Sequence, residues 1–178
     1  MKGILNDTTL VKTGVWYSPK SYEIGYLDQH YKTLSPQDSV FETIKNLVPE
    51  WDDKQIRNHL NAFLFRKNEE VETLVSDLSG GEKARLALAQ IGAKTPKLLI
   101  LDEITNNLDR QTCRYVLEVL QHYPGAMIVI SHNKNFLDQL HLTSTYLIDQ
   151  GKVYRQPWRK ALGSLKQLYK TQDLKKSL

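Results

Sequence analysis

Two kinds of hydrophobic pattern follow one another in the first half of the chain. The segment YEIGYLD, residues 22–28, is short and rich in β-forming residues, so it predicts a strand that runs into a loop at Gln29. Residues 36–75 change to helical spacing, where Ser39 can cap one helix and a second helix carries an apolar face. That face holds Ile56, Leu60, Phe63 and Leu64. The pattern predicts a small helical subdomain.

From residue 79 onward, helical and strand patterns alternate. The alternation predicts a parallel sheet covered by helices, and the continuous apolar runs LLIL and MIVI are typical of strands buried on both faces. The expected fold class is therefore α/β, with a mostly parallel sheet flanked by helices. The predicted helices are residues 82–91, 109–122 and 134–140, and the predicted strands are residues 97–101, 127–131 and 145–149.

Polar residues follow two of these apolar strands. Asp102 and Glu103 come after the first, and Ser131 and His132 come after the second. Because parallel sheets place their ligands at the carboxyl ends of the strands, we expect these side chains to form part of a site.

Charge is distributed unevenly along a chain whose formal net charge is +4. Residues 151–178 hold eight Lys or Arg and one acid, Asp173, so the basic character belongs to the C-terminal end. Cys113 is the only cysteine, which excludes an intramolecular disulfide. The sequence shows no secretory leader and no run of about 18 apolar residues. These features favour a cytoplasmic protein that is not inserted in a membrane.

The segment LSGGE, Leu78, Ser79, Gly80, Gly81 and Glu82, places a hydroxyl and two glycines before a predicted helix. Glycines let backbone N–H groups approach a ligand closely, and the partial positive charge of a helix N-terminus suits a phosphate. The alternative is an ordinary helix start, with Ser79 as the N-cap and Glu82 closing a capping box.

The segment LLILDE ends in two adjacent carboxylates. The segment resembles a Walker B strand, in which an apolar strand holds the first carboxylate, here Asp102, beneath a Mg²⁺ ion. The resemblance implies that the second carboxylate, here Glu103, polarises the attacking water or accepts its proton. The alternative is a pair of surface acids at the end of a strand. The position behind a buried strand and after LSGGE favours the functional interpretation.

Taken together, IGYLDQHY, LSGGEKARLALA and LLILDEITNNLD resemble the ATP-binding cassette (ABC) ATPase domain, and most closely its F subfamily. The resemblance covers roughly residues 1–155. It implies a partial P-loop NTPase fold of the ABC type, ATP and Mg²⁺ as cofactors, and an ATP hydrolase as the family activity. It also implies a helical subdomain at about residues 36–78 and leaves residues 156–178 as a basic tail.

The resemblance also assigns roles to single residues. Glu103 and His132 match the catalytic glutamate and the switch histidine of the family, and Asp102 matches the residue that holds Mg²⁺. Gln29 matches the Q-loop glutamine, which contacts both Mg²⁺ and the nucleotide. The remaining ATP-binding residues that it implies are Leu78, Ser79, Gly80, Gly81, Glu82, Asn107 and Asp109, the last of which can equally serve as a helix N-cap.

The chain departs from the family at single positions and in one whole motif. Ile104 stands where the family has Pro, and Asn107 stands where it commonly has His. More importantly, the phosphate loop of the form G-x-x-x-x-G-K-[ST], whose amides and lysine hold the phosphates, does not occur in the 178 residues. We expect the chain to begin just downstream of that loop, and therefore to bind ATP weakly by itself.

Three functions remain open from the sequence. The first is an ATPase of the F subfamily, whose relatives act at the ribosome in translation or antibiotic resistance. The second is the ATPase subunit of an ABC transporter. The third is a non-catalytic fragment that donates its LSGGE segment to a partner. The transporter subunit would need a membrane partner. The family resemblance implies a second ABC domain, in another chain or in a homodimer, and the basic tail could in addition contact ribosomal RNA.

Overall fold

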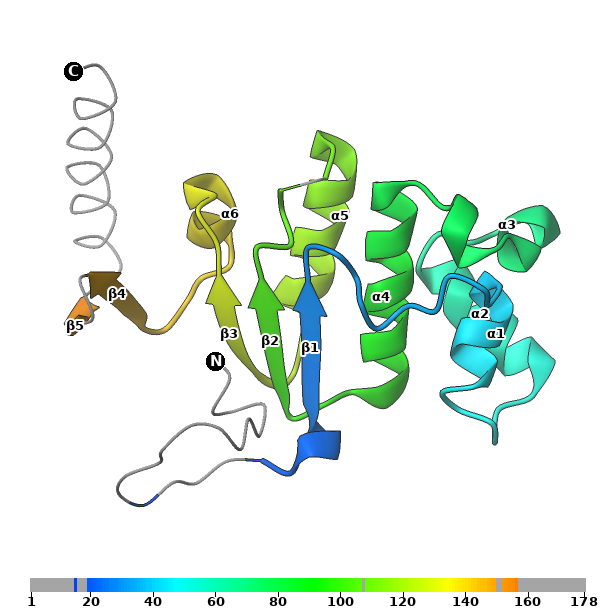
Figure 1. Ribbon diagram of the computed structural model, residues 1–178, viewed down its shortest axis with the longest axis horizontal. Helices are drawn as coiled ribbons and strands as arrows, with labels where there is room; N and C mark the ends of the chain where they lie inside the picture. The colour runs from blue at the N-terminus through cyan, green and yellow to red at the C-terminus, as the bar shows by residue number, and fades with distance from the viewer. Residues whose placement is uncertain (1–14, 16–18, 107, 150–151, 157–178) are drawn as a thin grey trace. The chain divides into compact units, whose positions relative to one another are not determined.

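The computed structural model describes residue 15 and residues 19–106, 108–149 and 152–156. The chain divides into two compact units, Met1–His132 and Asn133–Leu178. Figure 1 shows the helices and strands in chain order, and among the described residues the first unit holds β1–β3 and α1–α5. Its strands are β1 (Ile24–Asp28), β2 (Leu98–Asp102) and β3 (Ala126–Ile130), and its helices are α1 (Val40–Lys45), α2 (Asp53–Ala62), α3 (Asn68–Glu72), α4 (Gly80–Lys94) and α5 (Arg110–Gln121), with 3₁₀ turns at Ser21–Glu23 and Val75–Asp77.

The three strands of the first unit form a parallel sheet in the order β1-β2-β3. The central strand β2 is completely apolar before its last residue, and Leu99, Ile100 and Leu101 are fully buried. Helices α4 and α5 lie against the sheet (Figure 1). The α/β class that the sequence predicted, a parallel sheet flanked by helices, is confirmed.

Strand β3 is less buried than its sequence predicted. Ala126 at its start is exposed, and Ile130 at its end is 37% exposed. The residues of LLIL are all buried, whereas those of MIVI are half-buried or exposed, and β3 has one neighbouring strand in the described sheet where β2 has two. The prediction of burial on both faces is therefore right for LLIL and wrong for MIVI.

Helix α4 connects the sheet to the smaller helices. It contacts α5 on one side and α1 and α2 on the other. Ile56 and Leu60 of α2 are fully buried, as the apolar spacing predicted. Helix α2 ends at Ala62, however, because the chain turns through Leu64, whose φ of 67° is left-handed. The predicted Ser39 cap of α1 is confirmed, since its side chain accepts a hydrogen bond from the Glu42 amide.

The second unit contains α6 (Lys134–Gln139), β4 (Thr145–Asp149) and β5 (Lys152–Gln156). The sequence predicted residues 145–149 as a further strand of the parallel sheet. Instead, β4 pairs with β5 in an antiparallel two-stranded sheet. Only two residues separate β4 from β5, and a link of that length joins antiparallel strands, because parallel strands need a long crossover.

Among the described residues, none of the helices combines the length and the apolar character needed to cross a membrane.

Candidate functional site

Two aspartates end neighbouring strands at the same level of the sheet, because Asp28 of β1 pairs in register with Asp102 of β2. Asp28 is 7% exposed, and its Oδ1 accepts hydrogen bonds from the amides of His30 (3.0 Å) and Lys32 (3.3 Å). The Lys32 Nζ lies 3.4 Å from its other oxygen. Asp28 thus closes the loop after β1 and has little capacity for a ligand.

The half-buried carboxylate of Asp102 is in a different situation. Its Oδ2 accepts a hydrogen bond of 3.1 Å from the hydroxyl of Tyr26, which comes from β1. Among the residues that the structure describes, Oδ1 has no hydrogen-bond or ion-pair partner. One carboxylate oxygen at the end of the central strand is therefore open to a cation or a water molecule.

Glu103 and His132 contact each other beside Asp102. The Nε2 of His132 lies 3.2 Å from Oε1 of Glu103, and the His132 amide lies 3.4 Å from Oε2. The backbone amide of Glu103 donates to the carbonyl of Ile130 on β3. Glu103 has a φ of 52°, a left-handed conformation that is uncommon for a residue with a side chain and is found preferentially at functional sites. His132 thus contacts the carboxylate of Glu103, and the carbonyl of Ile130 holds its backbone amide.

Gln29 begins the loop that follows β1, and its amide is held by two neighbours. The Nδ2 of Asn106 donates a hydrogen bond of 3.1 Å to Oε1 of Gln29, and Nε2 of Gln29 lies 3.1 Å from Nε2 of His30. Asn106 belongs to the loop after Glu103, so this contact joins the ends of β1 and β2. Asn107, which the sequence predicted as a nucleotide contact, lies outside the described residues.

The LSGGE segment forms the start of α4. Oε2 of Glu82 accepts hydrogen bonds from the Ser79 amide (2.8 Å) and the Ser79 hydroxyl (2.6 Å). The hydrogen bond from the Ser79 side chain is the main cause that lowers the pKa of Glu82. The capping-box alternative is therefore confirmed. A phosphate that binds at the start of α4 therefore has to share the Ser79 hydroxyl with the Glu82 carboxylate. Of the other predicted residues in this segment, Leu78 is buried and Gly80 is exposed.

Gly81 shows how closely the starts of α4 and α5 approach each other. A Cβ at this position would lie 2.8 Å from Oγ1 of Thr112 and 3.4 Å from Oδ2 of Asp109. Asp109 caps α5, because it accepts hydrogen bonds from the amides of Gln111 and Thr112 and, at 2.6 Å, from the Thr112 hydroxyl. The LSGGE segment and Asp109 are thus neighbours within one chain, and the N-cap role considered for Asp109 is confirmed.

We expect Gly81→Ala to lower the free energy of unfolding by about 1–3 kcal/mol, the usual cost of extra volume in a packed contact. The Thr112 side chain cannot rotate away without losing its bond to Asp109. Urea unfolding would measure the change, with the exposed neighbour Gly80→Ala as the matched control. Adding Thr112→Ala to Gly81→Ala should restore part of the loss. Equal losses in the Gly80 and Gly81 variants would contradict the steric explanation.

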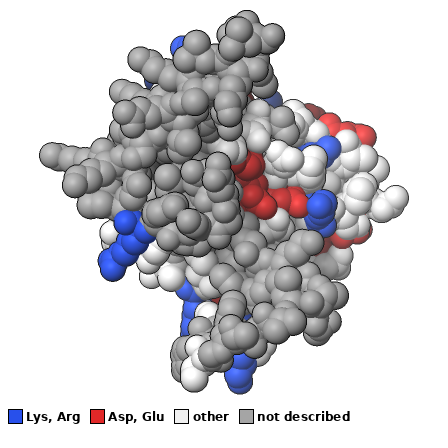
Figure 2. Space-filling model, turned by 60° about the vertical axis from the view of Figure 1, so that its left-hand side comes forward, with Lys and Arg blue, Asp and Glu red and all other residues white. Residues whose placement is uncertain are grey.

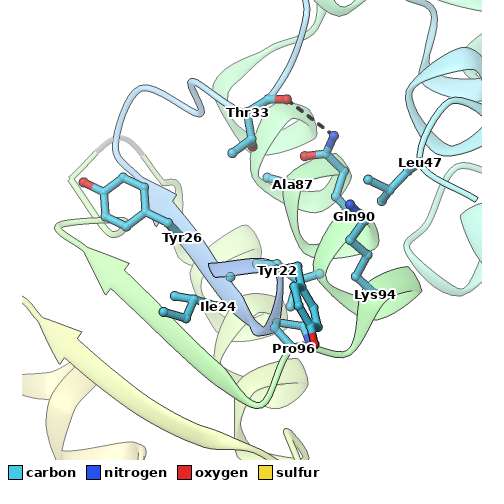
Figure 3. Close-up of a pocket in the computed structure, with 11 residues that line it drawn as sticks. Tyr22, Ile24, Tyr26, Thr33, Leu47, Ala87, Gln90, Lys94 and Pro96 are labelled. Atoms are coloured by element: carbon cyan, nitrogen blue, oxygen red, sulfur yellow. Dashed lines mark hydrogen bonds between the residues drawn. The ribbon is translucent and has the colours of Figure 1, made fainter. Parts of the chain in front are cut away.

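A cavity of about 220 Å³ lies beside β1, against α4 (Figure 3). Tyr22, Gln90 and Lys94 are among the residues that line it. None of the site residues predicted from the sequence lines this cavity, so the candidate site is the carboxyl end of the sheet together with the starts of α4 and α5.

Figure 2 shows a group of acidic side chains with Lys or Arg side chains beside it on one face of the molecule.

Comparison with known proteins decides the family. The family model described as "ABC transporter" matches residues 4–106, more than half of the chain. The chain belongs to the ATP-binding cassette family. Members of this family bind ATP, so the cofactor that the motifs implied is the cofactor of the family. The match includes the LSGGE and LLILDE segments, which confirms the predicted resemblance.

Two curated relatives place the chain more closely. The "Probable ATP-binding protein YheS" of Haemophilus influenzae is 38% identical over 135 residues, which are 75% of this chain and 21% of the relative. The "ATP-binding protein Uup" of Buchnera aphidicola is 38% identical over 128 residues, 70% of this chain and 21% of the relative. These relatives confirm the resemblance to the F subfamily. The chain spans about a fifth of the length of the curated relatives that it matches.

A solved structure supports the fold. A dimeric ATP-binding cassette, MJ0796, bound to ADP and phosphate in a post-hydrolysis state, superposes with a TM-score of 0.60 at 20% sequence identity. The match covers 74% of this chain and 62% of that chain. At this identity the similarity concerns the fold alone, and it agrees with the partial P-loop fold expected from the motifs.

Three contacts at the site were not found from the sequence. They are the hydroxyl of Tyr26 on Asp102, the amide of Asn106 on Gln29, and the hydroxyl of Thr112 against Gly81. The first two join residues more than 70 positions apart. Only the parallel register of β1 and β2 could have indicated them, since it brings the ends of these strands together.

Proposed function

We propose that this chain supplies the catalytic carboxylates of one ATP-hydrolysing site of the F-subfamily type and the LSGGE segment of a second site, in its partner. The observation that carries the proposal is the end of β2. There Asp102 keeps one carboxylate oxygen open, and the adjacent Glu103 is held by His132. An aspartate can hold the metal ion and a glutamate can activate the water, which are two of the roles that phosphoryl transfer to water uses.

In this proposal Glu103 acts as the general base. Hydrolysis joins the oxygen of a water molecule to the γ-phosphorus and breaks the bond from that phosphorus to the bridging oxygen of ADP. Glu103 accepts the proton that the water loses. His132 orients Glu103 through its Nε2, and the His132 side chain is 78% exposed.

The residues fit a magnesium ion that takes most of its ligands from elsewhere. Within the described part of the chain, no group of three or more His, Cys, Asp or Glu residues could hold a metal. Mg²⁺ is commonly bound by one or two carboxylates together with phosphate oxygens and water, so Asp102, with Gln29 nearby, suffices. Bound there, Mg²⁺ would neutralise charge that develops on the phosphate oxygens.

A second ABC domain is the partner that the proposal requires. The 178 residues contain no G-x-x-x-x-G-K-[ST] loop, so another segment or another polypeptide has to hold the phosphates. The dimeric solved cassette supports a pairing of two such domains. In the pair, Ser79 to Glu82 would meet the nucleotide of the partner, assisted by the partial positive charge at the start of α4.

The test is complementation between two chains. A cassette domain with an intact phosphate loop, whose own LSGGE serine is replaced by arginine, is mixed with this chain and ATP hydrolysis is measured. We expect the wild-type chain to restore hydrolysis and Ser79→Arg to fail. Ser76→Arg, at an exposed position just before the segment, is the matched control. No restoration by the wild-type chain would overturn the proposed trans site.

The proposal extends to the setting of the whole protein, which we infer to be a cytoplasmic member of the translation- or antibiotic-resistance-associated class. The incomplete ABC domain would span residues 1–155. The basic residues 156–178, proposed to contact RNA, lie outside the described residues. The alternative is a non-catalytic fragment that only donates its LSGGE segment. Hydrolysis that is unaffected by Glu103→Gln once a phosphate loop completes this chain's own site would support that alternative.

A further inference from the structure

The hydroxyl of Tyr26 crosses from one strand to the carboxylate of the next. Tyr26 pairs in register with Ile100, and Asp102 lies two residues further along β2, on the same face of the sheet. The phenol therefore reaches along the sheet toward its carboxyl end and donates a hydrogen bond of 3.1 Å to Oδ2 of Asp102. In Figure 3 the Tyr26 ring extends from β1 away from Gln90 and Lys94 of α4.

The two strand-end aspartates show what this contact does. Asp28 is held by two backbone amides and Lys32, whereas Asp102 has Tyr26 as its single polar partner within the described residues. Without the phenol, the Asp102 side chain would have no hydrogen bond to select one rotamer. With it, Oδ2 is engaged and Oδ1 is left as the oxygen that a ligand can take.

We propose that Tyr26 is a positioning residue that fixes the Asp102 carboxylate with Oδ1 directed to a divalent cation. This inference rests on the proposed function, because it assumes that Asp102 is the metal carboxylate. Tyr26 itself does not contact the cation. It acts by reducing the conformational freedom that Asp102 would lose when the cation binds.

The chemistry of the phenol suits this role. Burial, and then the hydrogen bond to Asp102, raise the pKa of Tyr26 above its ordinary value. The phenol hydroxyl is the donor in this contact, and the Asp102 carboxylate is the acceptor. Phenylalanine at this position would keep the ring and lose only the donor.

The experiment measures the affinity of the full chain for Mn²⁺, used as a paramagnetic probe for Mg²⁺. With ¹³C-labelled aspartate, Mn²⁺ broadens the carboxyl NMR signal of any aspartate that binds it, so weak binding at Asp102 can be followed without ATP or turnover. We expect Tyr26→Phe to raise the Mn²⁺ concentration for half-maximal broadening about two- to tenfold, the usual range for one hydrogen bond. Tyr22→Phe is the matched control, because Tyr22 is 72% exposed and should leave the titration unchanged.

Two outcomes separate the inference from the proposed function beneath it. If Mn²⁺ broadens the Asp102 signal equally in wild type and Tyr26→Phe, the positioning role is overturned although the metal site stands. If Mn²⁺ does not broaden the Asp102 signal in the wild type, and Asp102→Asn leaves the total Mn²⁺ binding of the chain unchanged, the metal role of Asp102 fails and the inference fails with it. A shift confined to Tyr26→Phe supports the proposal.

Discussion

Glu103→Gln is expected to slow ATP hydrolysis by roughly 10²- to 10⁴-fold in a site completed by a phosphate loop, the range that a general base contributes. Glutamine keeps the shape of the side chain and can still contact His132, but it cannot accept the proton of the attacking water. Nucleotide binding should persist, because Glu103 is not proposed to hold the phosphates. The measurement is phosphate release at saturating ATP, alongside nucleotide affinity.

The control for that prediction is Glu118→Gln, which makes the same chemical change at an exposed position of α5. It should leave the rate unchanged. His132→Ala should also slow hydrolysis, since it removes the Nε2 that lies 3.2 Å from the Glu103 carboxylate. A Glu103→Gln variant that hydrolyses ATP at the wild-type rate would show that another group activates the water.

The second large effect concerns stability. Leu99→Ala should lower the free energy of unfolding by about 2–5 kcal/mol, because it removes a fully buried side chain from the central strand and leaves a cavity. Strand β2 also carries Asp102, so the loss would weaken the element on which the site is built. Urea unfolding followed by circular dichroism measures it.

Leu74→Ala is the matched substitution at the surface, since Leu74 is 44% exposed. We expect it to cost less than about 1 kcal/mol. If the two leucine variants unfolded at the same urea concentration, β2 would not be the core of the first unit.

The sequence predicted best what depends on short stretches of chain. An uninterrupted apolar run such as LLIL has no polar side to expose, so a buried strand was the expected result, and β2 is that strand. Ser39, Ser79 and Asp109 cap helices through bonds to amides two or three residues ahead, which local spacing alone can indicate.

The sequence could not predict features that depend on which strands become neighbours. MIVI has the same apolar character as LLIL, but it lies at one side of the described sheet and is only half covered. Residues 145–149 were expected to join the parallel sheet, yet the strand formed by residues 152–156 pairs with them instead. The contact of Tyr26 with Asp102 likewise exists only because β1 and β2 pair in one register.

The interpretation of Gly81 changed for a physical reason. The sequence suggested that glycine there lets a phosphate approach the backbone. The structure shows that Thr112 already occupies the space of a side chain, so glycine is required by packing even without a ligand. Both requirements can hold together, because the contact with α5 lies within the same segment that is proposed to meet the nucleotide.

The central claim is that the 178 residues hold part of a nucleotide site and need a phosphate loop from elsewhere. Equilibrium binding of a fluorescent ATP analogue tests it most directly, with the chain alone, an intact cassette domain alone, and the two mixed under conditions that prevent hydrolysis. The account predicts negligible binding by the chain alone and tighter binding in the mixture than with the cassette domain alone. Micromolar affinity of the chain alone, or a mixture that binds no better than the cassette domain, would contradict it.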